Sequence, residues 1–433
     1  MKKYVITIVA ALLIFGIFIF AVEGKDLINN QKKISQVTTT SQDEDVVSVK
    51  EVQSSSSDSE TIASVPLDFG ELVVDAKLKK EDIEKREECG LSVDGINAAY
   101  KECSNLYGFT SLSDDLKQLY LELYIIFTNK TSDVVVCSVS EMDLAKVYKV
   151  VMADHPEIFY IDGFEYVKYS TGNVITKIEV SPALTMSEDE IAKASEYIKQ
   201  YVDVFKSGIN LTSSTDYDKV KYTYGFIIVN TEYLETSDQG QNILSVIVNQ
   251  QSVCQGYAKT FQYLLSQIGV DSFLVTGYTK KDNVPHAWNI VKMDGEWYYI
   301  DCTWGDSNLS GENASLSDID YSFFGVTTDE ILRTHVPDNT TTMPVCTATK
   351  DNYYYKEGAY FDSLDGPKLK GLFNSAYATG QSSVTVKCAN SSVYNLMLGE
   401  LIDGNKIFDY LESGTSNMSY YVNEDLYIIT FIF

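Results

Sequence analysis

Histidine is scarce in this chain, with three in 433 residues. Basic residues are also few: 34 lysines and arginines stand against 61 aspartates and glutamates, a formal net charge of −27. A nucleic-acid partner needs a basic surface to meet its phosphates, so this balance argues against nucleic acid as a ligand. It also disfavours adhesion of the folded part to anionic lipid headgroups. A cationic substrate is compatible with the charge, but solubility alone accounts for it equally well.

Metal and cofactor motifs are missing as well. The seven cysteines include no CxxC pair and no Cys/His cluster, which makes a zinc site unexpected. The polar stretch after Thr303 lacks the ligand spacing of an EF-hand, so it is interpreted as a solvated loop. No fixed-period repeat is evident, which disfavours a solenoid. We therefore expect no cofactor and no metal.

The cysteines are too sparse to indicate a disulfide scaffold. If Cys254 is set aside as a working thiol, six remain, enough for three bridges in an oxidising compartment. Their spacing shows no framework, and we expect free buried thiols. The six are Cys89, Cys103, Cys137, Cys302, Cys346 and Cys388.

The N-terminal segment indicates export. Lys2 and Lys3 precede an apolar run of nineteen residues from Tyr4 to Val22. Residues 1–24 are thus predicted to be a signal peptide or an N-terminal membrane anchor. The poor small-x-small pattern around Ala21 favours the anchor. The remaining chain would be extracytoplasmic, touching the membrane through this segment only.

The rest of the chain divides by composition. Residues 25–66 are rich in Ser, Thr and acidic residues and are predicted to be a disordered linker. Residues 67–212 predict a mostly helical α+β domain, with helices near 78–88, 92–106, 113–128, 140–153 and 187–206. Short strands follow His155, with turns at Asp162-Gly163 and at Thr171-Gly172-Asn173. Residues 213–345 and 346–433 predict a central domain and a small α+β domain, the latter with helices near 366–378 and 392–411.

A hairpin is the clearest local prediction in the central domain. Asp294-Gly295 separates two aromatic-rich runs, which is a strong signal for a two-residue turn. Counting back from the turn puts His286, Trp288 and Asp301 on one face, with His286 and Asp301 as diagonal neighbours roughly 7–8 Å apart. An Asp beside an imidazole can fix its tautomer and stabilise its cation. A buried histidine satisfied by an acid is the equally open alternative.

A nucleophile would decide between these alternatives. Residues 250–269 predict a helix that starts at Cys254, with an apolar stripe and Gly269 as its stop. A thiol at a helix N-terminus is biased towards thiolate, and a neighbouring imidazolium would strengthen that bias. A small buried cysteine is the alternative.

Four blocks together resemble the transglutaminase-like superfamily, which is similar in layout to papain-type thiol enzymes. They are Cys254-Gln255-Gly256-Tyr257-Ala258, Gly277-Tyr278, His286-Ala287-Trp288-Asn289 and Trp297-Tyr298-Tyr299-Ile300-Asp301-Cys302-Thr303-Trp304. The resemblance covers roughly residues 215–305. It implies an α+β fold in which a helix carrying the cysteine packs on an antiparallel sheet carrying the histidine and the aspartate. Cys302 stands where bacterial members commonly have proline or an aliphatic residue, and it is predicted to be buried on the face opposite Asp301.

The resemblance implies that Cys254 attacks an acyl carbon, that His286 moves the proton and that Asp301 orients His286. The Cys254 backbone N–H is the default oxyanion donor. Tyr233, Gln241, Asn242 and Trp288 are further oxyanion or cleft candidates, although core packing also accounts for the aromatic ones. His155 is interpreted as a helix-end residue, and His335 receives no role because no acid is paired with it across strands.

The leading functional hypothesis is an extracytoplasmic thiol enzyme that cleaves or transfers peptide or isopeptide amide bonds, with protease or amidase activity favoured over transglutaminase activity. Its partner would be a protein or peptide substrate, with cell-wall peptide as one candidate. The alternative is a non-catalytic cell-surface adhesion or scaffold protein that keeps the same fold. Hydrolysis and transamidation share one acyl-enzyme, so the triad does not distinguish them.

Overall fold

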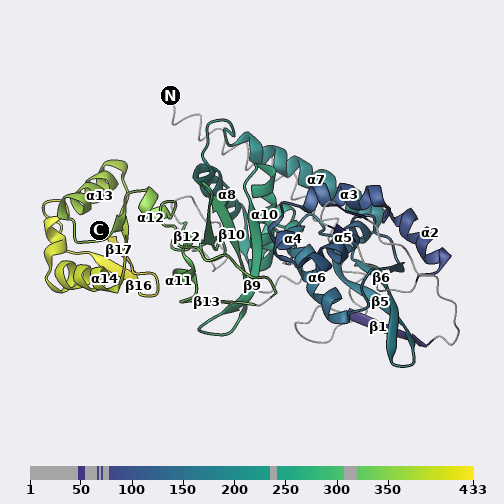
Figure 1. Ribbon diagram of the computed structural model, residues 1–433. Helices are drawn as coiled ribbons and strands as arrows, with labels where there is room; N and C mark the ends of the chain where they lie inside the picture. Colours follow the sequence, from purple (N-terminus) through teal and green to yellow (C-terminus); the bar gives the residue numbers. More distant parts are fainter. Residues whose placement is uncertain are drawn as a thin grey trace.

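The computed structural model describes residues 47–53, 66–67, 70–71, 78–234, 241–306, 319–338 and 340–433, the first three ranges as backbone only. The predicted signal or anchor segment, residues 1–24, lies outside these residues. Figure 1 shows a helical N-terminal region, a central sheet with its helices and a C-terminal module following one another across the molecule. The fold is α+β, with helices and antiparallel strands mixed along the chain.

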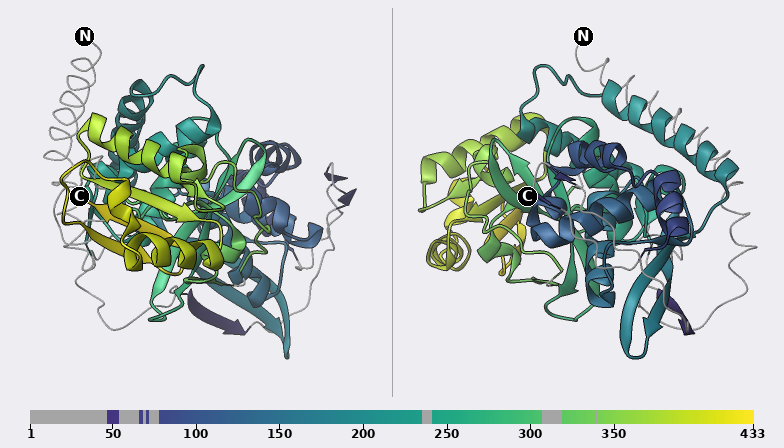
Figure 2. Two further views of the ribbon diagram at one scale, coloured as in Figure 1. Left: turned by 90° about the vertical axis from the view of Figure 1, so that its left-hand side faces the viewer. Right: turned by 45° about the vertical axis from the view of Figure 1, so that its right-hand side comes forward.

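Apart from α4, the N-terminal helices begin within one or two residues of their predicted starts. They are α2 (Lys80–Cys89), α3 (Val93–Cys103), α4 (Tyr107–Ser111), α5 (Asp114–Thr128), α6 (Glu141–Asp154) and α7 (Glu188–Ser207). Serine starts several of them: the Ser140 and Ser187 hydroxyls accept from backbone N–H groups of the first turn, which satisfies donors that the helix leaves free. The long helix α7 runs along the outside of the molecule (Figure 2). The short helix α4 was not predicted.

A four-stranded sheet completes this region. Its order is β1 (Val47–Gln53), β5 (Ile161–Thr171), β6 (Val174–Leu184) and β4 (Val134–Val135), with β1 parallel to β5 and the other pairs antiparallel. The turn predicted at Gly172 joins β5 to β6. The turn predicted at Asp162-Gly163 is wrong: both residues lie within β5, where the register shifts and Gly163 has a φ of 125°. A bulge of this kind favours a glycine with positive φ, as many turns do, so the two are hard to distinguish in the sequence.

Strand β1 corrects the prediction for residues 25–66. The backbone of residues 47–53 forms seven parallel pairs with β5, so this part of the expected linker belongs to a sheet. The valine-rich sequence VSVKEVQ favours a strand once β5 provides an edge to pair with. The polar residues on either side of it make this strand propensity hard to recognise in the sequence. Two short strands, β2 (Pro66–Leu67) and β3 (Gly70–Glu71), pair with each other.

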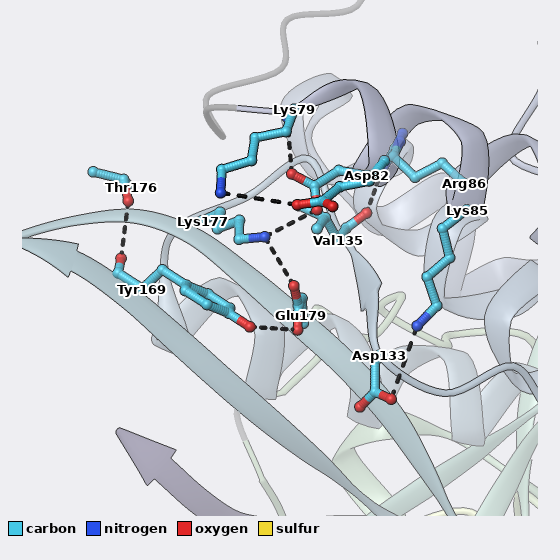
Figure 3. Close-up of polar contacts among 11 residues, drawn as sticks. Lys79, Asp82, Lys85, Arg86, Asp133, Val135, Tyr169, Thr176, Lys177 and Glu179 are labelled. Atoms are coloured by element: carbon cyan, nitrogen blue, oxygen red, sulfur yellow. Dashed lines mark hydrogen bonds and ion pairs between the residues drawn. The ribbon is translucent and has the colours of Figure 1, made fainter. Parts of the chain in front are cut away.

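Ion pairs tie α2 to the sheet (Figure 3). Lys177 on β6 contacts Asp82 and Glu179, each at 2.9 Å, and its ammonium lies 4.2 Å from the centre of the Tyr169 ring. The Arg86 guanidinium donates to the carbonyl of Val135 at 2.5 Å. It also pairs at 2.8 Å with Glu122, which is fully buried. Buried charges need such partners, so these pairs hold α2 in one position over β4 and β6.

The central sheet is entirely antiparallel. Its order is β12 (Phe324–Val326), β11 (Glu296–Ile300), β10 (Pro285–Met293), β9 (Ser272–Thr279) and β13 (His335–Pro337). Helices α8 (Asp216–Asn230), α9 (Ile243–Ile247) and α10 (Cys254–Gln267) accompany it, and α10 packs on β9 and β10. Two short parallel strands, β7 (Glu232–Tyr233) and β8 (Gln251–Ser252), lie just before α10.

The predicted hairpin register is confirmed over the paired residues. Met293 pairs with Glu296 and Asn289 with Ile300, around a turn in which Asp294 and Gly295 both have positive φ. Both central residues of a type I′ turn need this conformation. The ladder ends at Ile300, so Asp301 follows the strand rather than lying within it. Its N–H instead donates to the carbonyl of Phe323.

The C-terminal module has its own sheet and core. Strands β14 (Tyr360–Phe361), β15 (Ser383–Cys388), β17 (Ile428–Ile432) and β16 (Ser419–Asn423) lie in that order. The helices are α11 (Thr328–Ile331) and α12 (Tyr353–Lys356) before the module, and α13 (Gly366–Thr379) and α14 (Ser391–Met397) within it. The helix predicted to span 392–411 is wrong in its second half, which is a π-helical turn at Leu398–Asp403 and a 3₁₀ turn at Lys406–Asp409. Gly399 and Gly404 weaken a continuous α-helix there.

The hydrophobic cores show which parts depend on one another. One core contains residues from Cys89 to Phe324 and so joins the N-terminal region to the central helices. A second belongs to the C-terminal module, from Phe361 to Phe431. A third lies on the central sheet around Trp288 and includes Leu426 and Ile428 of the module. In the part of the chain that the structure describes, no helix is long and apolar enough to cross a membrane.

Candidate active site

Cys254 is the first residue of α10, as predicted. The apolar stripe that predicts this helix is buried, including Tyr257, Phe261 and Leu264. The helix ends at Gln267, and Gly269 follows two residues later with a φ of 73°, a conformation that favours glycine. All seven cysteines are free, and Cys254 alone among them is partly exposed rather than buried. The fold therefore leaves one thiol open to solvent, at the positive end of a helix dipole.

His286 and Asp301 are brought into direct contact. His286 lies near the start of β10, and its Nε2 atom is 2.7 Å from Oδ2 of Asp301, just beyond β11. Both are buried, with 8% of His286 and none of Asp301 exposed. The Cys254 thiol interacts with the His286 ring. Because Nε2 is engaged by Asp301, Nδ1 is the ring nitrogen left for the thiol.

The charges in this group support one another. Burial by itself would lower the pKa of His286, but the charge and hydrogen bond of Asp301, together with the interaction with Cys254, raise it above its ordinary value. Burial would raise the pKa of Asp301, but the charges and hydrogen bonds of His286 and His335 lower it instead. The site thus favours an imidazolium against a carboxylate, which is the state that stabilises a neighbouring thiolate.

Main-chain contacts hold the Asp301 carboxylate and its backbone. The N–H groups of Thr303 and Trp304 donate to Oδ1 at 2.9 and 3.1 Å. The Tyr224 hydroxyl lies 3.2 Å from the Asp301 carbonyl and 2.8 Å from that of Asp320. Cys302 is 2% exposed and packs in the large core away from these groups, as predicted.

His335 contradicts its prediction. It was given no role for want of a paired acid, yet its Nε2 lies 3.2 Å from Oδ2 of Asp301. The contact is invisible in the sequence because Asp301 is 34 residues away and β13 returns to the far edge of the sheet. The scarcity of histidine was the only hint in the sequence that His335 belongs to the site. Two of the three histidines contact the Asp301 carboxylate.

The two imidazoles and the carboxylate also resemble a metal-binding group. One ligand atom from each of His286, Asp301 and His335 lies within 4.8 Å of the others. These atoms bond one another directly at 2.7 and 3.2 Å, so hydrogen bonding accounts for the grouping without an ion.

The other predicted candidates fall in different places. Tyr233 is half-buried on β7 and pairs with Ser252, two residues before Cys254, so it lies beside the entrance to α10. Gln241 is exposed, and Asn242 caps α9 through its side chain. Trp288 is fully buried with its ring 5.9 Å from that of His286, so it supports the histidine from within the core instead of lining an open cleft.

Asn289 contributes a contact that the sequence reasoning missed. It is fully buried on β10, and its Nδ2 donates to the carbonyl of Ala258 on α10 at 3.1 Å. Small residues, Ala258 and Ala287, pack here with Leu274 and Cys254. This close approach sets the start of the helix against the strand that carries His286.

A second Cys-His-acid group lies in the N-terminal region. Cys103 Sγ is 3.8 Å from Nε2 of His155, whose Nδ1 is 2.7 Å from Glu157. His155 also ends α6, as predicted, and its Nε2 contacts the hydroxyl of Tyr120. Cys103 has no exposed surface, and burial raises the pKa of its thiol. This group is therefore structural. Among the seven cysteines, only Cys254 has both a histidine partner and a side chain that is partly exposed to solvent.

Known proteins resemble the part of the chain that carries this site. Residues 205–302 match the model of the transglutaminase-like superfamily. Kyphoscoliosis peptidase from Homo sapiens is 22% identical over 227 residues, covering 46% of this chain and 33% of that protein. The Mus musculus protein of the same name is 22% identical over 243 residues, covering 50% and 36%. The match thus spans about a third of the length of these relatives.

Two solved structures match over 32% of this chain. One is a TGase, with a TM-score of 0.24, 15% identity and 51% of that chain covered. The other is a protein from Cytophaga hutchinsonii assigned as a cysteine protease, with a TM-score of 0.21, 17% identity and 62% covered. Residues 205–302 are thus identified, by the family model, as a transglutaminase-like domain within this chain.

Proposed function

We propose that this protein is a thiol enzyme in which Cys254, His286 and Asp301 form the catalytic triad, and that it hydrolyses amide bonds of a protein or peptide substrate. The observation that carries the proposal is the 2.7 Å contact between His286 and Asp301 beside the one partly exposed thiol. A buried histidine satisfied by an acid needs no accessible cysteine at a helix start next to it.

The chemistry follows from these positions. Cys254 attacks the carbonyl carbon as thiolate, and a C–S bond forms as the carbonyl π electrons move to oxygen. His286 gives its proton to the leaving nitrogen as the C–N bond breaks, which leaves a thioester on Cys254. His286 then takes a proton from water as the water oxygen attacks the thioester carbon. The C–S bond breaks, which releases the acid and restores the Cys254 thiolate beside the imidazolium. Asp301 keeps the ring oriented and stabilises its cation throughout.

The oxyanion needs donors at the point where charge develops. The N–H of Cys254 is the first candidate, because first-turn N–H groups have no partner within a helix. Tyr233 is the second, since its strand runs beside Ser252 at the entrance to α10. Gln241 is a third candidate from the same connection.

Hydrolysis is preferred to transamidation on one observation: the curated relatives are named peptidases. An extracytoplasmic location, with the chain anchored or exported through residues 1–24, is supported by Lys2, Lys3 and the apolar run after them. Cell-wall peptides are a substrate class that such a location would make available.

The test of the triad needs no substrate. The rate of Cys254 alkylation by iodoacetamide is followed against pH in the full chain, with Cys254→Ala to subtract the buried thiols and His286→Ala to remove the partner. We expect reactivity to persist well below the free-thiol pKa of about 8.5 and to fall at least tenfold at pH 6 in the His286 variant. A Cys254 that titrates as a free thiol in both proteins would refute the triad and favour the surface-scaffold alternative.

The reaction products show whether water or an amine accepts the acyl group from Cys254. Peptide mixtures that contain glutamine and lysine are incubated with the chain, with Cys254→Ala as the control, and analysed by mass spectrometry. Hydrolysis yields new chain ends or a gain of one water, whereas transfer yields glutamine–lysine cross-links with loss of ammonia. Cross-links without hydrolysis would replace the peptidase assignment by a transglutaminase.

A further inference from the structure

We propose that His335 is a positioning residue of this site: its Nε2–H donates to Asp301 and holds Oδ2 in place for His286. The inference rests on the proposed function for its catalytic meaning, but its structural half can be tested separately. It assigns a task to the third histidine of the chain.

The environment of His335 selects one tautomer. The hydroxyl of Thr334 lies 2.8 Å from Nδ1 of His335 and 3.4 Å from the carbonyl of Ile331, so the ring nitrogen is its nearer acceptor. The Nε2 atom of His335 lies 3.2 Å from a carboxylate oxygen, which can only accept. The proton therefore belongs on Nε2. The neutral Nε2–H form satisfies both contacts.

The carboxylate needs this donor because, among the residues that the structure describes, only His286 and His335 contact Oδ2. Both main-chain donors, at Thr303 and Trp304, bind Oδ1. His286 binds Oδ2, but this ring is the group that has to be oriented. Asp301 has no exposed surface, so bulk solvent does not supply a further donor. His335 thus fixes the second oxygen from outside the catalytic pair.

The ring of His335 is itself held rigidly. It has no exposed surface and lies 4.7 Å from Trp288, 4.5 Å from Trp304 and 5.3 Å from Phe323, measured between ring centres. The ring of His286 lies 5.3 Å away. A donor confined in this way loses little entropy when it holds the carboxylate.

The backbone that presents His335 is fixed from both sides. Strand β13 pairs with β9, with Val336 opposite Tyr278. Next to Tyr278, Gly277 lets β13 approach: a Cβ there would lie 2.1 Å from the carbonyl oxygen of Val336. On the other side, Arg333 donates to the carbonyl of Asp425 in the C-terminal module at 2.6 Å.

The test uses the small number of histidines. In the full chain labelled with ¹⁵N in histidine only, three imidazoles give signals, assigned with single variants. We expect His335 to be the Nε2–H tautomer and the Nε2–H proton of His286 to be downfield and protected from water. His335→Phe, which keeps an aromatic ring without a donor, should lose that protected His286 signal and slow Cys254 alkylation at pH 6 about tenfold, the effect of one lost hydrogen bond to a charge.

His335→Gln should restore both, since its amide nitrogen reaches the position of Nε2, and His155→Phe should change neither. The inference is overturned if His335 is the Nδ1–H tautomer, if the Phe variant matches the wild type, or if Gln behaves like Phe. Should the Phe variant fail to fold, His335→Asn replaces it, because its shorter amide falls short of Asp301. If Cys254 of the wild type titrates as a free thiol, the proposed function fails while the ¹⁵N signals still decide the role of His335.

Discussion

At the scale of single residues, Asp301 organises the site. Two imidazoles share Oδ2, at 2.7 and 3.2 Å, and two backbone N–H groups share Oδ1. A fully buried carboxylate is costly unless its oxygens are satisfied, and here four donors satisfy them. The same contacts lower the pKa of Asp301 and raise that of His286, so one negative charge supports the cation that a thiolate needs.

Asp301→Asn should therefore change the pH dependence of Cys254. Asp301 raises the pKa of His286, so its loss lowers that pKa and the imidazolium disappears at lower pH. Thiolate formation then moves up towards the free-thiol value of about 8.5, and alkylation at pH 6 should fall about tenfold to a hundredfold. The measurement is the alkylation rate from pH 4 to 10.

The matched control is Asp338→Asn, a carboxylate of the same region whose partners are Thr276 and the Thr340 N–H. It should leave the profile of Cys254 unchanged. An unchanged profile in the Asp301 variant would mean that the carboxylate only packs the histidine.

At the scale of elements, local sequence specified most helices and the hairpin. Ser140 and Ser187 mark helix starts, and Asp294-Gly295 sets the register of β10 and β11. The failures have physical causes. Gly163 makes a bulge instead of a turn, and strand β13 is three residues long, too short for any periodic signal. Strand β1 depends on an edge that β5 provides from more than a hundred residues away.

Gly277→Ala should displace β13. Its Cβ would lie 2.1 Å from the carbonyl oxygen of Val336 and 2.9 Å from both Pro337 Cα and the Trp288 ring, and backbone atoms cannot give way cheaply. We expect a loss of about 2–3 kcal/mol in the free energy of unfolding, typical of overpacking. Amide exchange at Val336 should accelerate, which mass spectrometry can detect.

Gly371→Ala is the matched control. Gly371 lies inside α13, and a Cβ there meets nothing within 4 Å. This variant should be stabilised by about 0.5–1 kcal/mol, because alanine is the better helix former. Equal stability of the two variants would show that the close approach of β13 does not depend on Gly277.

At the scale of the whole molecule, the C-terminal module follows the central sheet (Figure 1), and a shared hydrophobic core with Leu426 and Ile428 joins the two. Lys387 on β15 is 1% exposed and pairs at 2.7 Å with Glu330, which also starts α11 through Thr327. The ammonium donates to the carbonyl of Leu426 as well. The segment that leads to His335 is therefore braced by the module.

Lys387→Met should weaken this junction. It leaves the Glu330 carboxylate in place without its cation, and breaking a buried pair in this way costs about 3–5 kcal/mol. Glu330 keeps its bonds to Thr327 and some exposure, so we expect a loss of about 2 kcal/mol in equilibrium urea unfolding. Adding Glu330→Gln should recover part of the loss, because no unpaired charge remains. A double variant less stable than the single one would contradict the pairing.

The parts of this protein that depend on neighbours along the chain follow from its amino-acid sequence. The Cys254 helix, the hairpin that carries His286 and the contact of His286 with Asp301 across one turn follow from periods of 3.6 and 2 and from turn chemistry. Tertiary structure alone decided the role of His335, the burial of Trp288 and the exposure of Cys254 against the burial of Cys103. These depend on which distant segments pack together, and such long-range pairing leaves no periodic trace in the local sequence.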